Sequence, residues 1–456
     1  MNETSTILAD EAAQFLADNP TVTNIDAMFA DISGIVRGKR LPAGDLVSFY
    51  ENGARLAGSI CFPSVRGETQ DPQGLGFSDG DPDVIARPIP GSLAVTPWGE
   101  KQTAQVLVSL TDVDGAPYAM APRNVLHRVL NRLSEAGLTA VVAFELEFYL
   151  VVQEENGAPH PPRGPISGRQ ADGVQLLSMA SLDEFNEFIS AVQSACTAQG
   201  IKTGAVTSEY APGQFEINLH HQISALAAAD SCILFRRTVA CLARRHGLIA
   251  TFMAKPYPDH AGSGQHMHIS LLDDGGKNVF ASPAGEPNQV LRQAIAGILD
   301  TLPEAMAILA PNTNAYRRYA PDLYVPVNSS WGYDNRSVAL RIPGGSNDNR
   351  RIEHRVASAD ANPYLCLATA LGGILHGLEQ GVDPPPEAAG NVCDAVDTSW
   401  PMRFDEALKV MRNGPLLSDH LGADYVRLYT ACKKLELDTF EREINPLEYR
   451  WLLSPE

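Results

Sequence analysis

Four apolar segments of this chain carry ionisable side chains at every second position, and this alternation limits the possible folds more than any other sequence feature. In "AFELEFYL" (143–150), Glu145 and Glu147 alternate with aromatic and aliphatic residues. Such a run predicts a strand, in which residues i and i+2 point to the same face. The two carboxylates therefore share one face. They repel each other there unless a cation, a donor network or water lies between them.

Three further segments repeat the pattern. A single segment of this kind is explained as well by a strand with one solvated face. Four in one chain favour a curved antiparallel sheet whose concave face is a polar channel that holds metal ions. The shared faces are Glu209, Glu216, Asn218 and His220 in "SEYAPGQFEINLHH", His266, His268 and Ser270 in "GSGQHMHISLL", and Arg351, Glu353 and Arg355 in "RRIEHRVAS".

The chemistry of these side chains indicates which metal they suit. Five carboxylates and one imidazole form a hard, oxygen-dominated set, which favours Mg²⁺ or Mn²⁺ over Zn²⁺. Six ligands are too many for one Mg²⁺ that keeps waters and phosphate oxygens, so at least two ions are implied. Several divalent ions beside guanidinium groups indicate phosphoryl transfer from a nucleotide, although each arginine also fits a surface ion-pair network. The arginines are Arg317, Arg318, Arg336, Arg341, Arg350, Arg351 and Arg355.

Charge and cysteine content exclude several classes of protein. The net charge of -19 argues against nucleic acid or an anionic membrane as the main partner. No apolar run is long enough for a membrane span, and the N-terminus carries acids where a signal peptide needs basic residues, so we expect a cytoplasmic enzyme. The 7 cysteines form no CxxC pair, which predicts reduced core residues.

The length of 456 residues predicts two unequal domains. A tract rich in Gly, Pro and Asp over residues 58–98 predicts loops at an active site or a subunit contact. After it, Pro122 and Asn124 are expected to open a helix that Gly137 closes. We place the boundary near Gly115, which gives domains 1–115 and 116–456.

Six motifs resemble those of the glutamine synthetase superfamily, in the same order and over nearly the whole chain. They are "DISGIVRGKRLP", "FELEFYL", "EYAPGQFEINL", "KPYPDHAGSGQHMHISL", "NSSWGYDNRSVALRIP" and "RIEHRVASADANPYL". The resemblance implies an α+β fold, with a small N-terminal β-grasp domain and a large catalytic domain of helices around a curved antiparallel sheet. It also implies a homo-oligomer of stacked rings, a dodecamer, with each active site between neighbouring subunits.

The resemblance further implies roles for individual residues, with glutamate, ATP and a small amine as substrates. Two or three Mg²⁺ or Mn²⁺ ions are expected per subunit, one beside the substrate carboxylate on Glu147, Glu209 and Glu216, and one on the ATP phosphates on Glu145, His266 and Glu353. Glutamate is expected at Gly262, Arg318 and Arg355, and ATP at His268, Ser270, Arg336, Arg341 and Arg351. The expected catalytic residues are Arg336, which steadies the transferring phosphoryl group, Arg318 and Glu353.

Departures from glutamine synthetases concern mainly the acceptor. "GSICFPSVRGE" (58–68) lacks the Asp-Gly-Ser-Ser segment that deprotonates ammonium, and Tyr324 stands where the flap carries a glutamate. Loss of both anions removes the ammonium site, and an aromatic side chain suits a larger amine. Ala261 replaces an asparagine near the expected glutamate site. The pattern resembles the γ-glutamylpolyamine (γ-glutamylputrescine) synthetase branch, which implies that ATP phosphorylates the glutamate γ-carboxylate and an amine then attacks it.

Other functions stay open at this point. They are a glutamine synthetase that uses ammonium, a ligase for a monoamine such as ethanolamine or methylamine, and a non-catalytic structural or regulatory relative. Five converging carboxylates argue against the last of these. The sequence does not fix the amine, because the second charge of a diamine can pair with Glu51, Glu68 or Asp71, and nothing in their spacing selects one.

Overall fold

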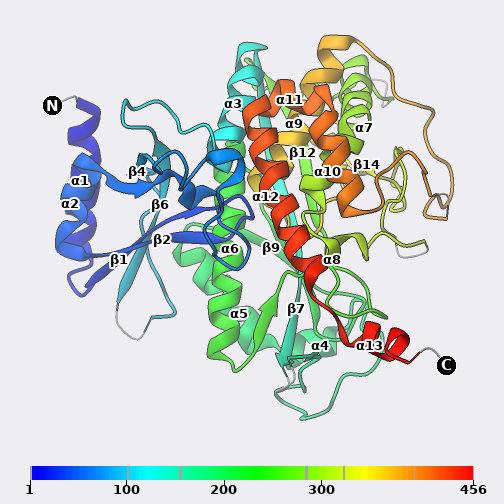
Figure 1. Cartoon of the computed structure of the whole chain (residues 1–456), viewed down its shortest axis with the longest axis horizontal. Coiled ribbons are helices and arrows are strands. Elements are labelled where there is room, and N and C mark those ends of the chain that lie inside the picture. Colours follow the sequence, from blue (N-terminus) through cyan, green and yellow to red (C-terminus); the bar gives the residue numbers. More distant parts are fainter. Residues whose placement is uncertain are drawn as a thin grey trace.

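Two β-sheets, one in each half of the chain, organise the computed structural model (Figure 1). The structure describes residues 3–99, 102–153, 157–282, 286–321, 324–394 and 396–454, with side chains from residue 10 onward. Helices surround the second sheet, whereas the first sheet lies to one side with the N-terminal helices (Figure 1). This arrangement confirms the predicted α+β class.

The first sheet contains the strands before residue 112. Its order is β2-β1-β6-β4-β3, with β5 paired to β6. The hairpin of β1 and β2 is antiparallel, and β1 runs parallel to β6. The strands are β1 (Asn24–Ala30), β2 (Val36–Pro42), β3 (Ala54–Ala57), β4 (Asp83–Pro88), β5 (Ala94–Val95) and β6 (Thr103–Thr111), with helices α1 (Glu3–Asp18) and α2 (Leu46–Asn52).

The tract over residues 58–98 is less irregular than the sequence predicted. Its first part has only two short 3-10 turns, Gly58–Cys61 and Pro72–Gly74. Strand β4 then pairs with both β3 and β6. Val84 and Ala86 of β4 are buried in the core. The sequence pattern did not predict this strand because Pro and Asp residues surround it.

The second sheet has the order β13-β14-β15-β12-β7-β10-β9, with β8 and β11 also paired to β7. Its pairs are antiparallel except for β13 with β14, which are parallel. The strands are β7 (Leu138–Gln153), β8 (Pro159–His160), β9 (Thr203–Ser208), β10 (Gln214–Leu219), β11 (Ile249–Thr251), β12 (Gln265–Asp273), β13 (Trp331–Tyr333), β14 (Leu340–Ile342) and β15 (Ile352–His354).

One face of this sheet is apolar and packs on two helices. The ring of Phe148 on β7 contacts Phe188 of α5 (Asn186–Ala198) and Phe235 of α6 (Ala225–Arg245), with centroids 6.5 and 6.4 Å apart. Phe144 and Leu146 on the same face of β7 are fully buried. Because side chains alternate along a strand, the opposite face is left for Glu145 and Glu147.

The helix predicted after residue 121 is present as α3 (Pro122–Glu135), with Pro122 in its first turn. Gly137 follows with a φ of 70°, a left-handed conformation that glycine adopts readily. Asn124 also lies in the first turn, but its side chain makes no cap hydrogen bond. Its amide instead donates to the carbonyls of Leu110 (2.7 Å) and Tyr118 (3.0 Å), which ties α3 to β6.

The remaining helices pack around the second sheet, and α7 and α9 approach each other closely. A side chain at Gly297 would meet the backbone of Gly373 and Gly377. No helix among the described residues combines the length and apolarity that a bilayer crossing needs. The bounds are α4 (Met179–Glu184), α7 (Gln289–Leu309), α8 (Thr313–Tyr316), α9 (Pro363–Gln380), α10 (Phe404–Asn413), α11 (Pro415–Leu421), α12 (Ala423–Arg442) and α13 (Pro446–Leu452).

The cysteines follow the prediction of reduced core residues. All 7 are free, and all except the half-buried Cys241 are buried. Burial raises the pKa of the Cys232 thiol to about 11, which keeps it protonated at neutral pH.

Candidate metal and nucleotide site

The site is built on the middle of β7, where neighbouring strands place polar residues beside its two glutamates. In the sheet register, His266 of β12 and Asn218 of β10 both lie opposite Glu145, one on each side. Glu216 of β10 lies opposite Glu147. Directly opposed residues of antiparallel strands point to the same face. The register therefore brings these five side chains together on the polar face.

A second set of opposed residues extends the same polar face of the sheet toward β14. Glu353 of β15 lies opposite both His268 of β12 and Arg341 of β14. Although β14 and β15 have only three residues each, their pairing places an arginine beside a buried carboxylate. The site therefore extends over five neighbouring strands, β10, β7, β12, β15 and β14.

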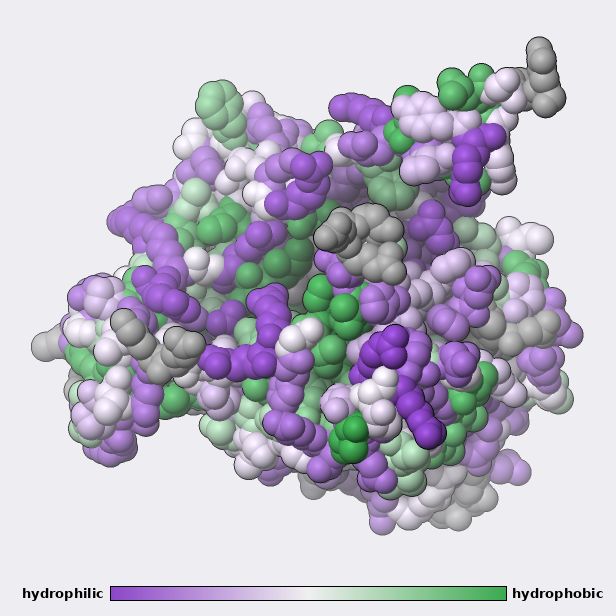
Figure 2. All heavy atoms as spheres, turned by 90° about the horizontal axis from the view of Figure 1, so that it is seen from below, coloured by the Kyte–Doolittle hydropathy of each residue, from purple (hydrophilic) through white to green (hydrophobic). Residues whose placement is uncertain are grey.

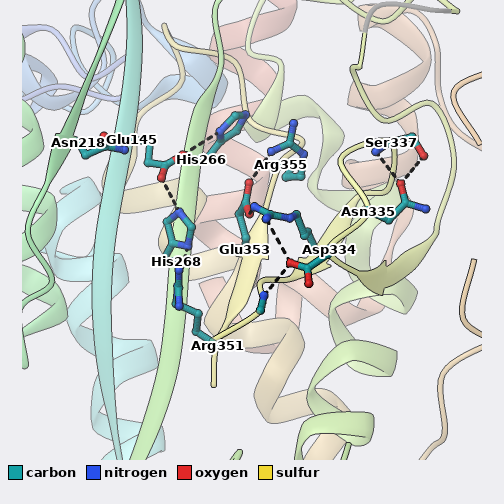
Figure 3. Close-up of polar contacts among 12 residues, drawn as sticks. Glu145, Asn218, His266, His268, Asp334, Asn335, Ser337, Arg351, Glu353 and Arg355 are labelled. Carbon is teal, nitrogen blue, oxygen red and sulfur yellow. Dashed lines mark hydrogen bonds and ion pairs between the residues drawn. The ribbon is translucent and has the colours of Figure 1, made fainter. Parts of the chain in front are cut away.

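Glu145 is held by two histidines, as Figure 3 shows. Its carboxylate lies 2.9 Å from Nε2 of His268 and 3.3 Å from Nδ1 of His266. Nε of Arg351 donates to Nδ1 of His268 (3.1 Å), so Nδ1 is an acceptor and the proton sits on Nε2, toward Glu145. Burial alone would raise the pKa of Glu145, but the hydrogen bonds from the histidines hold it well below its usual range. Glu145 is therefore an anion at neutral pH.

Glu353 is an anion for a different reason. Its carboxylate is 1% exposed and accepts Nη1 of Arg341 (2.7 Å) on one oxygen and Nη1 of Arg355 on the other. Burial opposes its ionisation, but the charges of Arg355, the histidines and Arg341 lower its pKa to about 2. The adjoining His354 is buried, and its pKa falls to about 4, so it stays neutral. Glu353 is thus a buried anion, and each of its two carboxylate oxygens is bound by one arginine.

Two groups of three side chains bring donor atoms close enough to bind one ion each. Glu145, His266 and Glu353 form the first group, and Glu147, Glu216 and His266 form the second. Within each group the donor atoms all lie within 4.8 Å of one another. The groups share His266, so two ion positions would be adjacent. Carboxylate oxygens with one imidazole suit Mg²⁺ or Mn²⁺.

The electrostatics of the second group also fit a cation. Burial, together with the charges of nearby glutamates, raises the pKa of Glu216 to about 9. Glu216 faces Glu147 directly in the sheet, an arrangement that is unfavourable without positive charge between the two. The donor set and its electrostatics thus agree with the expected divalent ions.

Glu209 lies just outside a strand, where the sequence pattern predicted it within one. It was expected on one strand with Glu216, but it follows the last residue of β9, and a turn over residues 210–213 separates the two. The turn reverses the chain, and the backbone N–H of Glu209 donates to the carbonyl of Gln214 (2.9 Å). Burial and the charge of Glu147 raise the pKa of Glu209 to about 7. It therefore lies near the second group without belonging to either group.

Arg318, expected to bind substrate, is almost fully buried. Its Nη1 donates to the carbonyls of Val356 (2.8 Å) and Ala357 (3.3 Å), and its buried Nε has no partner among the described residues. Gly262 and Gly264 make room for it, because a side chain at either would meet the arginine within 2.7 Å. Gly262 therefore has a packing role in addition to any contact with substrate.

Arg336 and Tyr324 line the same pocket. It has a volume of about 360 Å³ and adjoins a more open one of about 760 Å³, which Arg336 also lines. Tyr324 is 71% exposed with a φ of 53°, a left-handed conformation that is unusual for an aromatic residue. The neighbouring residues 322 and 323 lie outside the described residues. The first pocket is lined by Tyr324, Asn335, Arg336, Ser337, Gly390, Asn391 and Cys393.

Two features near these residues were not predicted. Asp334, with a φ of 48°, lies 3.4 Å from Nη2 of Arg341 and accepts the N–H of Gly344 (2.7 Å), as Figure 3 shows for its contacts. Its only sequence signal was an Asp-Asn pair, which tolerates left-handed turns. The carbonyl of Gly390 accepts a hydrogen bond from Asn335 Nδ2 (2.9 Å), which joins a loop distant in sequence to the segment that carries Arg336. This contact has no local sequence signal.

Ser270, expected near ATP, lies two residues beyond His268 on the same strand and is partly exposed.

A third group of potential ligands is already satisfied without a metal. Donor atoms of Glu379, Asp419 and His420 also lie within 4.8 Å of one another. Arg132 lies among them, 3.0 Å from each carboxylate and 2.9 Å from Nδ1 of His420. We interpret this group as an ion-pair cluster between helices.

Comparisons with known proteins agree with this geometry. The family model of the glutamine synthetase catalytic domain matches residues 119–452. The chain is 39% identical to γ-glutamylputrescine synthetase PuuA of Escherichia coli (strain K12), over 97% of this chain and 94% of that protein. It is 32% identical to glutamate–isopropylamine ligase of a Pseudomonas species, over 93% and 94%. A solved structure described as "Apo GmaS without ligand" matches 96% of this chain and 98% of its own, with a TM-score of 0.83 and 26% identity.

Proposed function

Because the chain belongs to the glutamine synthetase family, we propose that it joins the γ-carboxylate of glutamate to an alkyl amine at the expense of ATP. The γ-carboxylate first attacks the terminal phosphorus of ATP, which breaks the bond to the bridging oxygen, releases ADP and forms γ-glutamyl phosphate. The deprotonated amine then attacks the carbonyl carbon of this acyl phosphate, loses a proton and releases inorganic phosphate, which leaves a γ-glutamyl amide. Activation is needed because a carboxylate is a poor electrophile, whereas phosphate is a good leaving group.

One observation carries the proposal: two adjacent groups of metal donors that share His266. Bound divalent ions would neutralise the charge on phosphate and carboxylate oxygens during phosphoryl transfer. The first group, with Glu145 and Glu353, would hold the ion on the ATP phosphates. The second, with Glu147 and Glu216, would hold the ion beside glutamate, and Glu209 is near enough to complete it. We propose Mg²⁺ or Mn²⁺, two or three per subunit.

The arginines and histidines would position the reactants around these ions. Arg336 is exposed, and no ion pair is seen for it among the described residues, so its planar guanidinium is free to contact a transferring phosphoryl group. Arg341, Arg351 and His268 form the wall toward ATP. Arg355, held by Glu353, and Arg318, whose buried Nε has no partner among the described residues, would contact glutamate.

The acceptor is proposed to be putrescine or another polyamine, bound beside Tyr324. The relatives named above are γ-glutamylputrescine synthetase and glutamate–isopropylamine ligase, and both names specify an alkyl amine. None of the described residues that line the Tyr324 pocket is an acid, so these residues supply no fixed negative charge of the kind that an ammonium site needs. An aromatic ring instead favours contact with a carbon chain.

The test is phosphate release from ATP with glutamate and one amine at a time. We expect putrescine to give the highest catalytic efficiency, ethanolamine and methylamine lower values, and ammonium the lowest. Equal efficiency with ammonium would indicate a glutamine synthetase. Absence of amine-dependent release would indicate a non-catalytic relative.

We also propose that the chain assembles into stacked rings, with each site completed by a neighbouring copy. Helix α13 supports a contact between copies, because it has no buried residue and projects from the body of the molecule (Figures 1 and 2). Tyr449 and Leu452 are exposed there, and Trp451 is 67% exposed. Apolar side chains gathered on a projecting helix usually mark an interface. Replacing Trp451 with serine should shift the mass measured by light scattering toward smaller species.

The division of the chain near Gly115 remains part of this proposal. It is supported by the two sheets, whose strands lie before residue 112 and after residue 137, and by the family match, which begins at residue 119. We therefore propose a β-grasp domain over 1–115 and a catalytic domain over 116–456.

A further inference from the structure

One segment, residues 390–393, completes the wall of the pocket that Tyr324 and Arg336 share. Gly390, Asn391 and Cys393 line this pocket together with the two residues to which the proposed function assigns the amine and the phosphoryl group. The segment lies far beyond Arg336 in the sequence, so only the folded chain brings it to the pocket. Its contacts show how the two sides of the pocket are held relative to each other.

The segment that carries Arg336 is anchored to residues 390–392 by the side chains on both sides of the arginine. Nδ2 of Asn335 donates to the carbonyl of Gly390 (2.9 Å), and Oγ of Ser337 accepts the N–H of Val392 (3.1 Å). Oγ of Ser337 also donates to Oδ1 of Asn335 (2.6 Å), as Figure 3 shows. The backbone at Arg336 is therefore held before and after the arginine.

The segment that carries Tyr324 is anchored to the same part of the chain. Nδ2 of Asn328 donates to the carbonyl of Val392 (2.7 Å), and the N–H of Asp397 donates to the carbonyl of Val327 (2.9 Å). Both contacts lie several positions beyond Tyr324 in the sequence. They hold the later part of the segment and leave the backbone next to Tyr324 to a different contact.

Cys393 supplies that contact and joins the two sides of the pocket. Its Sγ lies 3.5 Å from the carbonyl oxygen of Val325 and 3.4 Å from that of Ser337. One thiol is thus shared by the neighbour of Tyr324 and the neighbour of Arg336. Cys393 is 1% exposed, so water does not compete for these contacts. Because a carbonyl oxygen can only accept, the thiol keeps its proton and donates it to one of the two at a time.

We propose that Cys393 is a positioning residue for the acceptor amine, because its thiol holds Tyr324 at a fixed distance from Arg336. This inference rests on the proposed function, in which the amine lies beside Tyr324 and the transferring phosphoryl group beside Arg336. Water can attack the carbonyl carbon of γ-glutamyl phosphate in place of the amine, which returns glutamate and releases phosphate. The amine outcompetes water only while it is held against that carbon. Cys393 thereby limits the loss of ATP to hydrolysis.

The experiment compares the ADP released with the γ-glutamyl amide formed, with putrescine as the amine. The wild type should produce equal amounts of the two. Cys393→Ala removes the donor, so ADP should exceed amide, and KM for putrescine should rise about three- to tenfold, the range of one net hydrogen bond. KM for ATP should stay unchanged, because Asn335 and Ser337 still anchor the Arg336 segment. Cys393→Ser keeps a donor and should restore most of the coupling.

Cys196→Ala is the matched control. Cys196 is also a free and fully buried cysteine, but it lies on α5, which packs on the apolar face of the second sheet. The same substitution there removes a buried thiol without touching the pocket. The ratio of ADP to amide and KM for putrescine should therefore keep their wild-type values, and the loss of Tm shows what a buried thiol contributes to packing alone.

The outcomes separate this inference from the proposed function. Equal amounts of ADP and amide in Cys393→Ala, with KM for putrescine unchanged, would overturn the role of Cys393 and leave the ligase function intact. So would the same defect in Cys196→Ala, or equal defects in Cys393→Ala and Cys393→Ser. Absence of amine-dependent turnover in the wild type would overturn both. Thermal unfolding identifies a damaged fold, and Cys393→Val, which fills the space of the thiol without a donor, then replaces the alanine variant.

Discussion

Glu216 lies directly opposite Glu147 on neighbouring antiparallel strands, so two carboxylates meet at a sheet position where like charges repel. Phe215 and Ile217, which flank Glu216 in sequence, are fully buried and hold the strand in this register. The apolar core therefore forces the acids together. Repulsion between the two carboxylates should therefore destabilise the metal-free protein, and a bound cation would offset this repulsion.

Divalent ions should be required for turnover. Chelation should abolish phosphate release, Mg²⁺ or Mn²⁺ should restore it, and Ca²⁺ should restore it poorly because it favours a larger, less regular coordination shell. Glu147→Ala should lower turnover at least about 100-fold by removing a ligand. The exposed Glu135→Gln on α3 is the control for a change of charge alone. Wild-type turnover by Glu147→Ala would refute the assignment of this ligand.

The stability of the metal-free protein should fall as pH rises. Burial and neighbouring carboxylates raise the pKa of Glu216 to about 9 and that of Glu209 to about 7. Acids with a raised pKa bind protons more tightly in the folded protein, so their contribution is present at low pH and is lost as pH rises through these values. Because Mg²⁺ competes with the same protons, the rise in Tm that it produces should grow between about pH 6 and about pH 9.

Glu216→Gln provides the matched variant for this pH dependence. It removes the opposed charge, so the metal-free protein should lose less Tm at high pH than the wild type. The stabilisation by Mg²⁺ should also be reduced. A Mg²⁺ effect on Tm that is independent of pH in both proteins would contradict the placement of these acids at an ion.

Arg336→Lys should separate catalysis from nucleotide binding. A lysine keeps the charge but not the planar fork, so kcat should fall about 100-fold or more while KM for ATP changes little. The exposed Arg412→Lys on α10 is the control. An increase in KM for ATP with kcat unchanged would make Arg336 a phosphate anchor.

Tyr324 should decide between ammonium and alkyl amines. The wild type is expected to use ammonium roughly 100-fold less efficiently than putrescine, because the described residues of the pocket supply no negative charge to hold a small cation. Tyr324→Glu should weaken binding of long amines and improve the use of ammonium, whereas Tyr324→Phe should behave as the wild type. Initial rates across both amines test this. Equal efficiency of the wild type with ammonium would show that the flap assignment is wrong.

Sequence periodicity predicted those parts of the site that lie on one strand. Glu145 and Glu147, and likewise His266 and His268, share a face because alternation is a local property of a strand. Glu209 was misplaced because the pattern reads through the turn "YAPG" as if the strand continued. The Pro and Gly within it were the available warning.

The parts that could not be predicted depend on contacts between segments far apart in sequence. The hydrogen bonds of Gln175 and Leu177 to the carbonyls of Tyr210 and Ser208, across the end of β9, have no local signal. The same is true of Gly390, whose carbonyl holds Asn335 beside Arg336. The contacts of Arg318 with the carbonyls of Val356 and Ala357 also had no local signal, whereas its role in binding substrate stays a prediction.

Strand β7 is paired with β8, β10, β11 and β12 along its 16 residues, and at Glu145 and Glu147 its two faces differ sharply in polarity. An inserted or deleted residue between Ala143 and Glu147 would turn carboxylates toward the phenylalanine core and a phenylalanine toward the ions. In evolutionary terms, this stretch can change by substitution but not in length. A homologue whose alignment shows a gap there should have lost the ligase chemistry, however similar the rest of its sequence is.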